Sequence, residues 1–150
     1  MGVERLRSFL RRHRRIALDT SIFIYQLEAN PRYLALADAV FSWVERTGHE
    51  AVTSTITMTE LLVPSYRDND EHRVDEFYGL LSTYPNLQWI APDLETADIA
   101  ARLRAVHRLR TPDALQAATG VRARATAFIT NDPVFARIDE FESVVFDQLL

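Results

Sequence analysis

The chain has 150 residues, of which 47% are hydrophobic, and this suffices for one domain with a single buried core. Its net charge of −4 argues against coating nucleic acid indiscriminately, so any contact with nucleic acid must be local. The absence of cysteine excludes disulfides, thiolate zinc sites and thiol nucleophiles. Because we also find no secretory signal pattern and no run of transmembrane length, we expect a cytoplasmic protein.

Residues 1–15 are expected to form a basic extension ahead of a single folded domain at residues 16–150. The extension contains six of the arginines, namely Arg5, Arg7, Arg11, Arg12, Arg14 and Arg15. One interpretation is a grip for RNA, and the other is the solvated edge of a helix. The sequence leaves both interpretations open.

Strand-like apolar segments alternate with helical patterns along the rest of the chain. The predicted strands are residues 16–19, 51–55, 87–90, 126–130 and 143–147. Residues 73–82 and 95–109 carry apolar side chains at helical spacing, and we expect both helices to pack on the sheet. This alternation predicts an α/β fold with a parallel sheet of about five strands flanked by helices.

Four acidic residues stand where predicted strands end or helices begin: Asp19, Glu60, Asp113 and Asp132. Asp19 interrupts an apolar run, Glu60 follows the second strand, Asp113 opens a helix, and Asp132 follows the fourth strand. Ligands of open parallel sheets bind outside the carboxyl ends of the strands, near the point where the strand order reverses. We therefore expect the four carboxylates to converge on one edge of the sheet.

Each acid also has a purely structural interpretation at a helix N-terminus. Thr57 and Glu60 have the spacing of a capping box, in which the acid bonds back to the first residue of the helix. Thr111 as a cap, followed by a proline and Asp113, suits the start of a helix without further purpose. Asp19 and Asp132 are in positions from which each could cap the next helix. Taken singly, these residues leave capping and function open.

Taken together, the local sequences around the acids resemble a known family. The matching segments are Leu18-Asp19-Thr20-Ser21, Thr59-Glu60-Leu61, Thr111-Pro112-Asp113-Ala114 and Ile129-Thr130-Asn131-Asp132. In this order they resemble PIN-domain ribonucleases, most of all the VapC-type toxins of bacterial toxin-antitoxin pairs. The resemblance runs from Ile16 to the C-terminus. It implies a parallel sheet with helices on both faces and an acidic pocket that binds Mg²⁺ or Mn²⁺.

The resemblance also implies roles for individual residues. Asp19, Asp113 and Asp132 are expected to hold the metal ion, and Glu60 to orient a water molecule or bridge through one. The flanking residues expected to support the acids are Thr20, Ser21, Thr130 and Asn131. Arg108 and Arg110 precede Asp113 and are candidates for contacts with the RNA backbone, although favourable charge near a helix end explains them equally well.

The function that follows from the resemblance is a Mg²⁺- or Mn²⁺-dependent endoribonuclease, the toxin of a VapBC-type pair that inhibits translation. Its expected partners are an RNA substrate, a VapB-like antitoxin and a second copy of the chain, with no membrane. The antitoxin would lie in a groove among the early helices. The alternative is a non-catalytic PIN module that binds RNA or a protein, although the presence of all four acids favours catalysis.

Other enzymes with a similar predicted fold are disfavoured. A phosphoryl-accepting receiver domain needs a lysine, and every basic residue here is arginine. A haloacid-type phosphatase needs a second acid where Ser21 stands. A dehydrogenase would have the glycine pattern of a dinucleotide site after its first strand, and none is present.

Overall fold

The computed structural model describes all 150 residues and contains one parallel sheet of five strands in the order β3-β2-β1-β4-β5. The strands are β1 (Arg15–Leu18), β2 (Glu50–Ser54), β3 (Leu87–Ile90), β4 (Ala127–Thr130) and β5 (Glu142–Val145). The chain builds β1, β2 and β3 toward one side and then returns to place β4 on the other side of β1. The α/β class and the parallel sheet are thus confirmed, and the strand order reverses at β1.

Strand β1 is central and pairs with both β2 and β4. Ala17 lies opposite Val52 of β2 and Phe128 of β4. Beyond the last strand residue, the amide of Asp19 donates to the carbonyl of Ile129 at 3.0 Å. This extra hydrogen bond fixes Asp19 at the carboxyl edge of the sheet, beside the end of β4.

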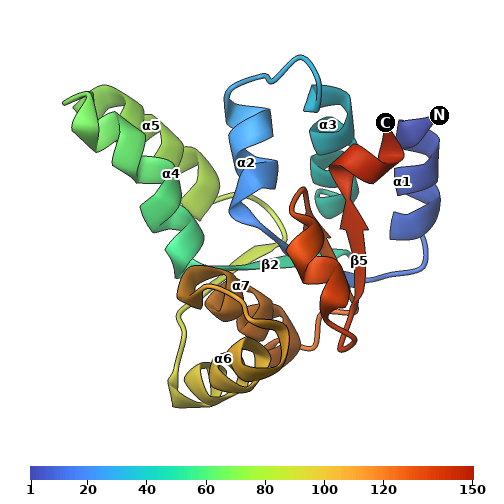
Figure 1. Cartoon of the computed structure of the whole chain (residues 1–150). Helices are drawn as coiled ribbons and strands as arrows, with labels where there is room; N and C mark the ends of the chain where they lie inside the picture. Colours follow the sequence, from blue (N-terminus) through green and yellow to red (C-terminus); the bar gives the residue numbers. More distant parts are fainter.

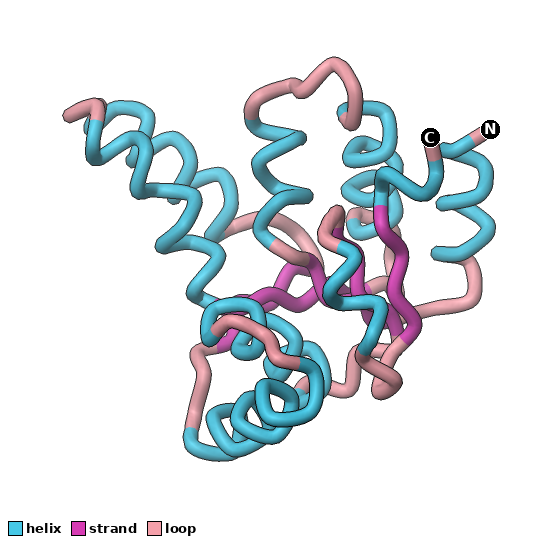
Figure 2. The backbone as a smooth tube through the Cα atoms, in the orientation of Figure 1, coloured by secondary structure: helices cyan, strands magenta, loops and turns pink.

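Helices cover both faces of the sheet, which passes between them in Figure 2. The helices are α1 (Gly2–Leu10), α2 (Thr20–Leu27), α3 (Leu34–Val44), α4 (Thr55–Arg67), α5 (Glu71–Ser82), α6 (Leu94–His107) and α7 (Thr111–Arg122), with short 3₁₀ turns η1 (Pro133–Arg137) and η2 (Phe146–Leu149). Helices α1, α2 and α3 lie on one face and α6 and α7 on the other (Figure 1). Side chains alternate along β1 accordingly: Ile16 and Leu18 enter one apolar cluster, and Ala17 enters the other.

Two helices do not pack where their sequence patterns predicted. Helix α5 packs on α4, and the pair projects from the domain as a hairpin (Figure 1), which leaves Tyr78 55% exposed. Helix α6 packs mainly on α7, so Val106 is 73% exposed. The reason is that α7 already occupies this face. A Cβ on its Gly120 would lie 3.0 Å from the Cβ of Ala17, so glycine lets α7 approach β1 more closely than a larger residue would without a shift of its neighbours.

The first residues of the chain contribute to the core. Helix α1 packs on α3 and η2, and its Leu6 and Leu10 are fully buried. Its arginines, Arg5 and Arg7, are exposed, and Arg12 in the turn that follows pairs with Glu142 at 2.9 Å. The helix edge is therefore solvated, whereas a contact of these arginines with RNA stays a prediction. None of the helices combines the length and the apolar character needed to cross a lipid bilayer.

Candidate active site

Asp19 joins the central strand to the helix that follows it. One carboxylate oxygen, Oδ1, accepts a hydrogen bond from the amide of Thr20 at 2.8 Å, so Asp19 caps α2 as its position predicted. The other oxygen, Oδ2, accepts from the hydroxyl of Thr130 at 2.8 Å and from that of Ser21 at 3.5 Å. The bond from Thr130 crosses from β4 to β1. Asp19 therefore caps α2 and is at the same time bound to the end of β4.

The electrostatic environment shows that other acids are near Asp19. The pKa of Asp19 is raised from 3.8 to about 6, chiefly by burial and in smaller part by the negative charges of Asp113 and Glu60. The hydrogen bonds from Thr130 and Thr20 act in the opposite direction and lower this pKa. Three acids from β1, α4 and α7 therefore influence one another at the edge where the strand order reverses.

Glu60 does not belong to a capping box. Helix α4 begins directly after β2, at Thr55, and the hydroxyl of Ser54 accepts from the amide of Ile56 at 3.2 Å as its cap. Glu60 thus lies in the second turn, where no backbone amide needs it. Its Oε1 accepts instead from the hydroxyl of Thr20 at 2.7 Å. The capping interpretation is wrong here because the helix is capped by Ser54, three residues before the cap that the pattern predicted.

A buried polar cluster that the sequence did not reveal lies beside Glu60. Gln116 of α7 donates from Nε2 to the hydroxyl oxygens of Thr57 at 2.8 Å and Thr20 at 3.1 Å. The hydroxyls of Thr57 and Thr53 are hydrogen-bonded at 2.8 Å, and Thr53 donates to the carbonyl of Leu18 at 2.9 Å. This cluster joins α2, α4, α7, β1 and β2 around the candidate site.

Asp113 lies at the start of α7, but its helix is capped differently from the prediction. The cap is Arg110, which makes no side-chain capping bond, and Thr111 is the first helical residue. Arg110 Nε donates to Asp113 Oδ2 at 3.3 Å, with the arginine 81% and the aspartate 19% exposed. Arg108 is exposed in a left-handed conformation at the end of α6. Of the two predicted arginines, only Arg110 contacts a predicted acid.

Asp132 follows β4 and caps η1 through a bond from the amide of Val134 to Oδ1 at 3.0 Å. Its own amide donates to the hydroxyl of Thr130 at 3.0 Å, the same hydroxyl that donates to Asp19. Asn131 points elsewhere: its Nδ2 donates to the hydroxyl of Tyr25 at 2.9 Å. The Thr-Asn-Asp segment is therefore fixed both to Asp19 and to α2.

The donor set fits a hard divalent cation. Carboxylate oxygens suit Mg²⁺ and Mn²⁺, and Mg²⁺ usually takes one or two protein carboxylates and keeps several waters. Because Asp19 is buried beside two other negative charges, a cation would relieve the cost of its ionisation. No three His, Asp or Glu side chains stand close enough to form a complete metal cage. The arrangement thus suits an ion held by few carboxylates and water.

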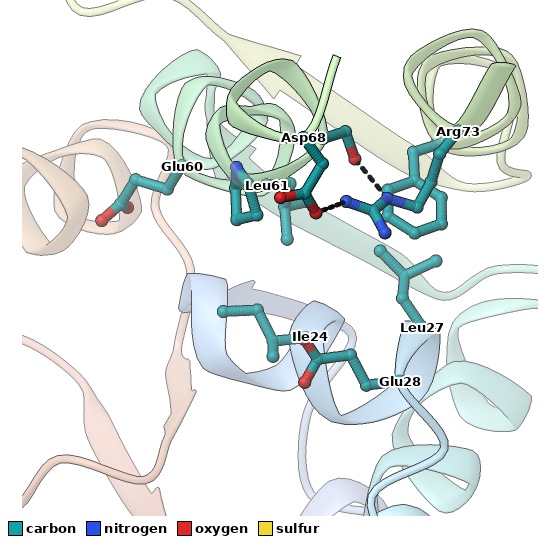
Figure 3. A pocket seen from close by; sticks show the side chains of 10 residues that line it. Ile24, Leu27, Glu28, Glu60, Leu61, Asp68 and Arg73 are labelled. Atoms are coloured by element: carbon teal, nitrogen blue, oxygen red, sulfur yellow. Dashed lines mark hydrogen bonds and ion pairs between the residues drawn. The ribbon is translucent and has the colours of Figure 1, made fainter. Parts of the chain in front are cut away.

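A groove of about 410 Å³ lies next to these acids, between α2 and the hairpin of α4 and α5. Its apolar wall contains Ile24, Leu27, Leu61, Pro64 and Phe77. Glu60 lies at one end of the groove and Arg73 at the other (Figure 3), where Arg73 bonds to Ser65 and Asp68, each at 2.7 Å. The groove therefore combines an apolar wall with polar and charged residues, and Glu60 connects it to the acidic site.

Comparison with family models identifies residues 16–141 as a PIN domain. The chain belongs to the PIN domain family. Solved structures with the same fold as this PIN domain include a toxin-antitoxin complex from Klebsiella pneumoniae, with 23% identity, a TM-score of 0.64, and coverage of 87% of this chain and 97% of that one. Another is VapBC-1 from nontypeable Haemophilus influenzae, with 20% identity, a TM-score of 0.68, and coverage of 89% and 98%.

A third similar structure is DNA-bound VapBC from Salmonella typhimurium, with 18% identity and a TM-score of 0.66. It covers 88% of this PIN domain chain and 98% of the chain matched. Comparison with curated proteins found no match. The fold of this PIN domain is therefore the one found in VapBC complexes.

Proposed function

We propose that this PIN domain is a metal-dependent endoribonuclease. The observation that carries the proposal is the convergence on Asp19 of the negative charges of Asp113 and Glu60, at the edge where the strand order reverses. Capping accounts for the position of Asp19 and Asp132, but it does not account for Glu60, which caps no helix.

The proposed reaction is hydrolysis of a phosphodiester. A bound Mg²⁺ or Mn²⁺ would supply positive charge to the phosphate and lower the pKa of the attacking water. Asp19, Asp113 and Asp132 would hold the ion, in part directly and in part through its bound water molecules, since no three acidic side chains stand close enough to form a complete cage. Glu60 would receive the water's proton at Oε2, since Oε1 is occupied by Thr20. The water oxygen bonds to phosphorus as the bond from phosphorus to one ribose oxygen breaks, and the released ribose oxygen takes up a proton from solvent.

Arg110 and Arg108 are proposed to contact the RNA backbone. Arg110 is 81% exposed and already lies against Asp113, so it can turn to a phosphate that approaches this acid. When the partner of Arg110 changes from the carboxylate of Asp113 to a phosphate, its guanidinium remains in an ion pair. An unpaired stretch of RNA is the proposed substrate, since proteins that read RNA sequence mostly bind unpaired bases.

The test is incubation of the purified protein with total cellular RNA in Mg²⁺, in Mn²⁺ and in EDTA. The proposal expects discrete fragments that require the metal and disappear in Asp19→Asn. Asp139→Asn serves as the matched control, because Asp139 is an exposed aspartate that makes no hydrogen bond or ion pair within the protein. A folded, metal-loaded wild type that binds RNA without cutting it would instead support a non-catalytic binding module.

We further propose that the chain is the toxin of a VapBC-type pair and inhibits translation in the cytoplasm, with a VapB-like antitoxin as its partner. The support is the shared fold with chains of VapBC complexes, together with the groove beside Glu60. An apolar helix could lie against Ile24, Leu27 and Leu61, with a basic residue reaching Glu60.

Two measurements address these partners. Coexpression with the product of a neighbouring gene should give a complex that Leu27→Arg disrupts, since Leu27 is half-buried and lines the groove, whereas Leu94→Arg at an exposed position should not. Sedimentation of the purified chain should show a homodimer, the assembly proposed for it. A monomer at all concentrations would contradict that assembly and leave the nuclease proposal unaffected.

A further inference from the structure

Gln116 is a polar residue in an otherwise small and apolar helix face. It is 3% exposed, and its neighbours on α7, Ala114, Ala117 and Ala118, are completely buried. A buried amide costs free energy unless its hydrogen bonds are satisfied. Gln116 lies one turn after Asp113, so it points from the same side of α7 toward the candidate site. Burial of a leucine at this position would cost less free energy than burial of an amide, so we expect the amide to have a function.

Gln116 is hydrogen-bonded on two sides: one bond leads through Thr20 to Glu60, and the other leads through Thr57 to Thr53. The amide nitrogen can only donate, and it donates to the hydroxyl oxygen of Thr20 at 3.1 Å. With its oxygen occupied in this way, Thr20 directs its own hydrogen to Glu60 Oε1 at 2.7 Å. Gln116 Nε2 itself lies 3.5 Å from the same oxygen. The reversed amide would place its oxygen against the carboxylate, which fixes the orientation.

The second hydrogen of the amide anchors the group. It bonds to the hydroxyl oxygen of Thr57 at 2.8 Å, and Thr57 bonds in turn to Thr53. Thr53 ends this chain at the carbonyl of Leu18, next to Asp19. All of these hydroxyls are buried, so no water competes for them. Glu60 is on the exposed side of α4, and this anchored amide is what restricts one of its two oxygens.

We propose that Gln116 is a positioning residue for Glu60: through Thr20 it holds Oε1 and leaves Oε2 free for the attacking water. The inference rests on the proposed nuclease function. Its physical basis is that a flexible glutamate on an exposed helix surface otherwise samples several rotamers, and misplacement of a catalytic group by about 1 Å can cost 100-fold in rate. Partners that orient ligands and bases are worth about 10- to 100-fold.

The test is a double-mutant cycle of Gln116→Met and Glu60→Gln. Methionine keeps the length of the side chain and removes both donors. Gln116→Met should lower kcat about 10-fold and change KM less than 2-fold, while in the Glu60→Gln background it should change neither. Mn²⁺ affinity, measured by calorimetry without RNA, should follow the same non-additive pattern. Thr119→Val is the matched control, because Thr119 is equally buried on α7 and bonds only to Leu115.

The outcomes separate the two proposals. Additive effects of Gln116→Met and Glu60→Gln, or full activity of Gln116→Met, would overturn the role of Gln116 while leaving the nuclease proposal standing. A wild type that neither cuts RNA nor binds Mn²⁺ would overturn both. If thermal unfolding shows that Gln116→Met does not fold, Thr20→Val replaces it in the cycle, since this change removes the hydroxyl that connects Gln116 with Glu60.

Discussion

Replacing Asp19 by asparagine should stabilise the metal-free protein at neutral pH, although it removes a central group of the candidate site. The pKa of Asp19 is raised from 3.8 to about 6 by burial and by the charges of Asp113 and Glu60. One pKa unit corresponds to about 1.4 kcal/mol, so the ionised carboxylate costs the native state about 3 kcal/mol at pH 7 and above. Asparagine is neutral and resembles the protonated acid in shape, so it avoids this cost.

The pH dependence follows from which state holds the proton. Between pH 3.8 and about 6 the folded protein keeps a proton on Asp19 that the unfolded chain has released. The contribution of Asp19 to stability therefore falls as pH rises through this window. Below it, both states are protonated and the difference between wild type and Asp19→Asn should vanish. Above it, the mutant should be more stable by about 3 kcal/mol.

Urea unfolding in EDTA, followed by circular dichroism between pH 4 and pH 8, measures this difference directly. Titrating groups far from Asp19 affect wild type and mutant alike, so subtracting the two curves isolates Asp19 together with the two acids coupled to it, Asp113 and Glu60. Asp139→Asn, at an exposed aspartate without partners, should give no difference at any pH. A stability difference between wild type and Asp19→Asn that is the same at pH 4.5 and pH 7.5 would refute the argument that burial and like charges dominate this site.

Three further predictions follow from the same geometry. Thr130→Val removes a hydrogen bond that lowers the pKa of Asp19, so this pKa should be higher in the mutant than in the wild type. NMR titration measures it, and an unchanged pKa would contradict the contact. Gly120→Val places a side chain against Ala17 and should lower the unfolding free energy by about 2 kcal/mol in urea, whereas an unchanged midpoint would mean that α7 can move away. Mg²⁺ at 100 times its Kd should stabilise the wild type by about 2.7 kcal/mol in thermal unfolding, with a smaller gain for Asp19→Asn; equal gains would place the ion elsewhere.

The sheet was predictable because each strand is a short apolar run between polar turns. The predicted segments 16–19 and 87–90 agree with β1 and β3 to within a residue, and the alternation with helices predicts parallel pairing. The packing partner of a helix is less predictable. The apolar face of α5 is real, but Val74 and Leu81 are its only buried residues, because α4 offers less surface than a sheet does. Periodicity identifies a buried face without saying what covers it.

At the candidate site, the sequence located acids more readily than the residues that hold them. Asp19 and Asp132 follow strands, and strand ends can be read from hydrophobicity. Gln116 and Thr57 give no such signal, since a polar residue within a helix ordinarily faces solvent. Only the crossing of α7 and α4 brings them together. The capping box at Thr57 was wrong for a related reason: Ser54 already ends β2 with a side chain able to cap, and a spacing rule does not register this.

The properties of Asp19 connect stability with the proposed chemistry. A buried carboxylate beside two like charges is unfavourable, and the fold retains it although asparagine would satisfy the same capping position. If a cation binds here as proposed, its attraction for the Asp19 carboxylate would offset the free energy that ionisation costs. Ion binding should then release a proton from Asp19 in the range around pH 6. Calorimetry of Mn²⁺ binding in two buffers of different ionisation enthalpy would count that proton, and a count of zero at pH 5.5 would separate Asp19 from the metal.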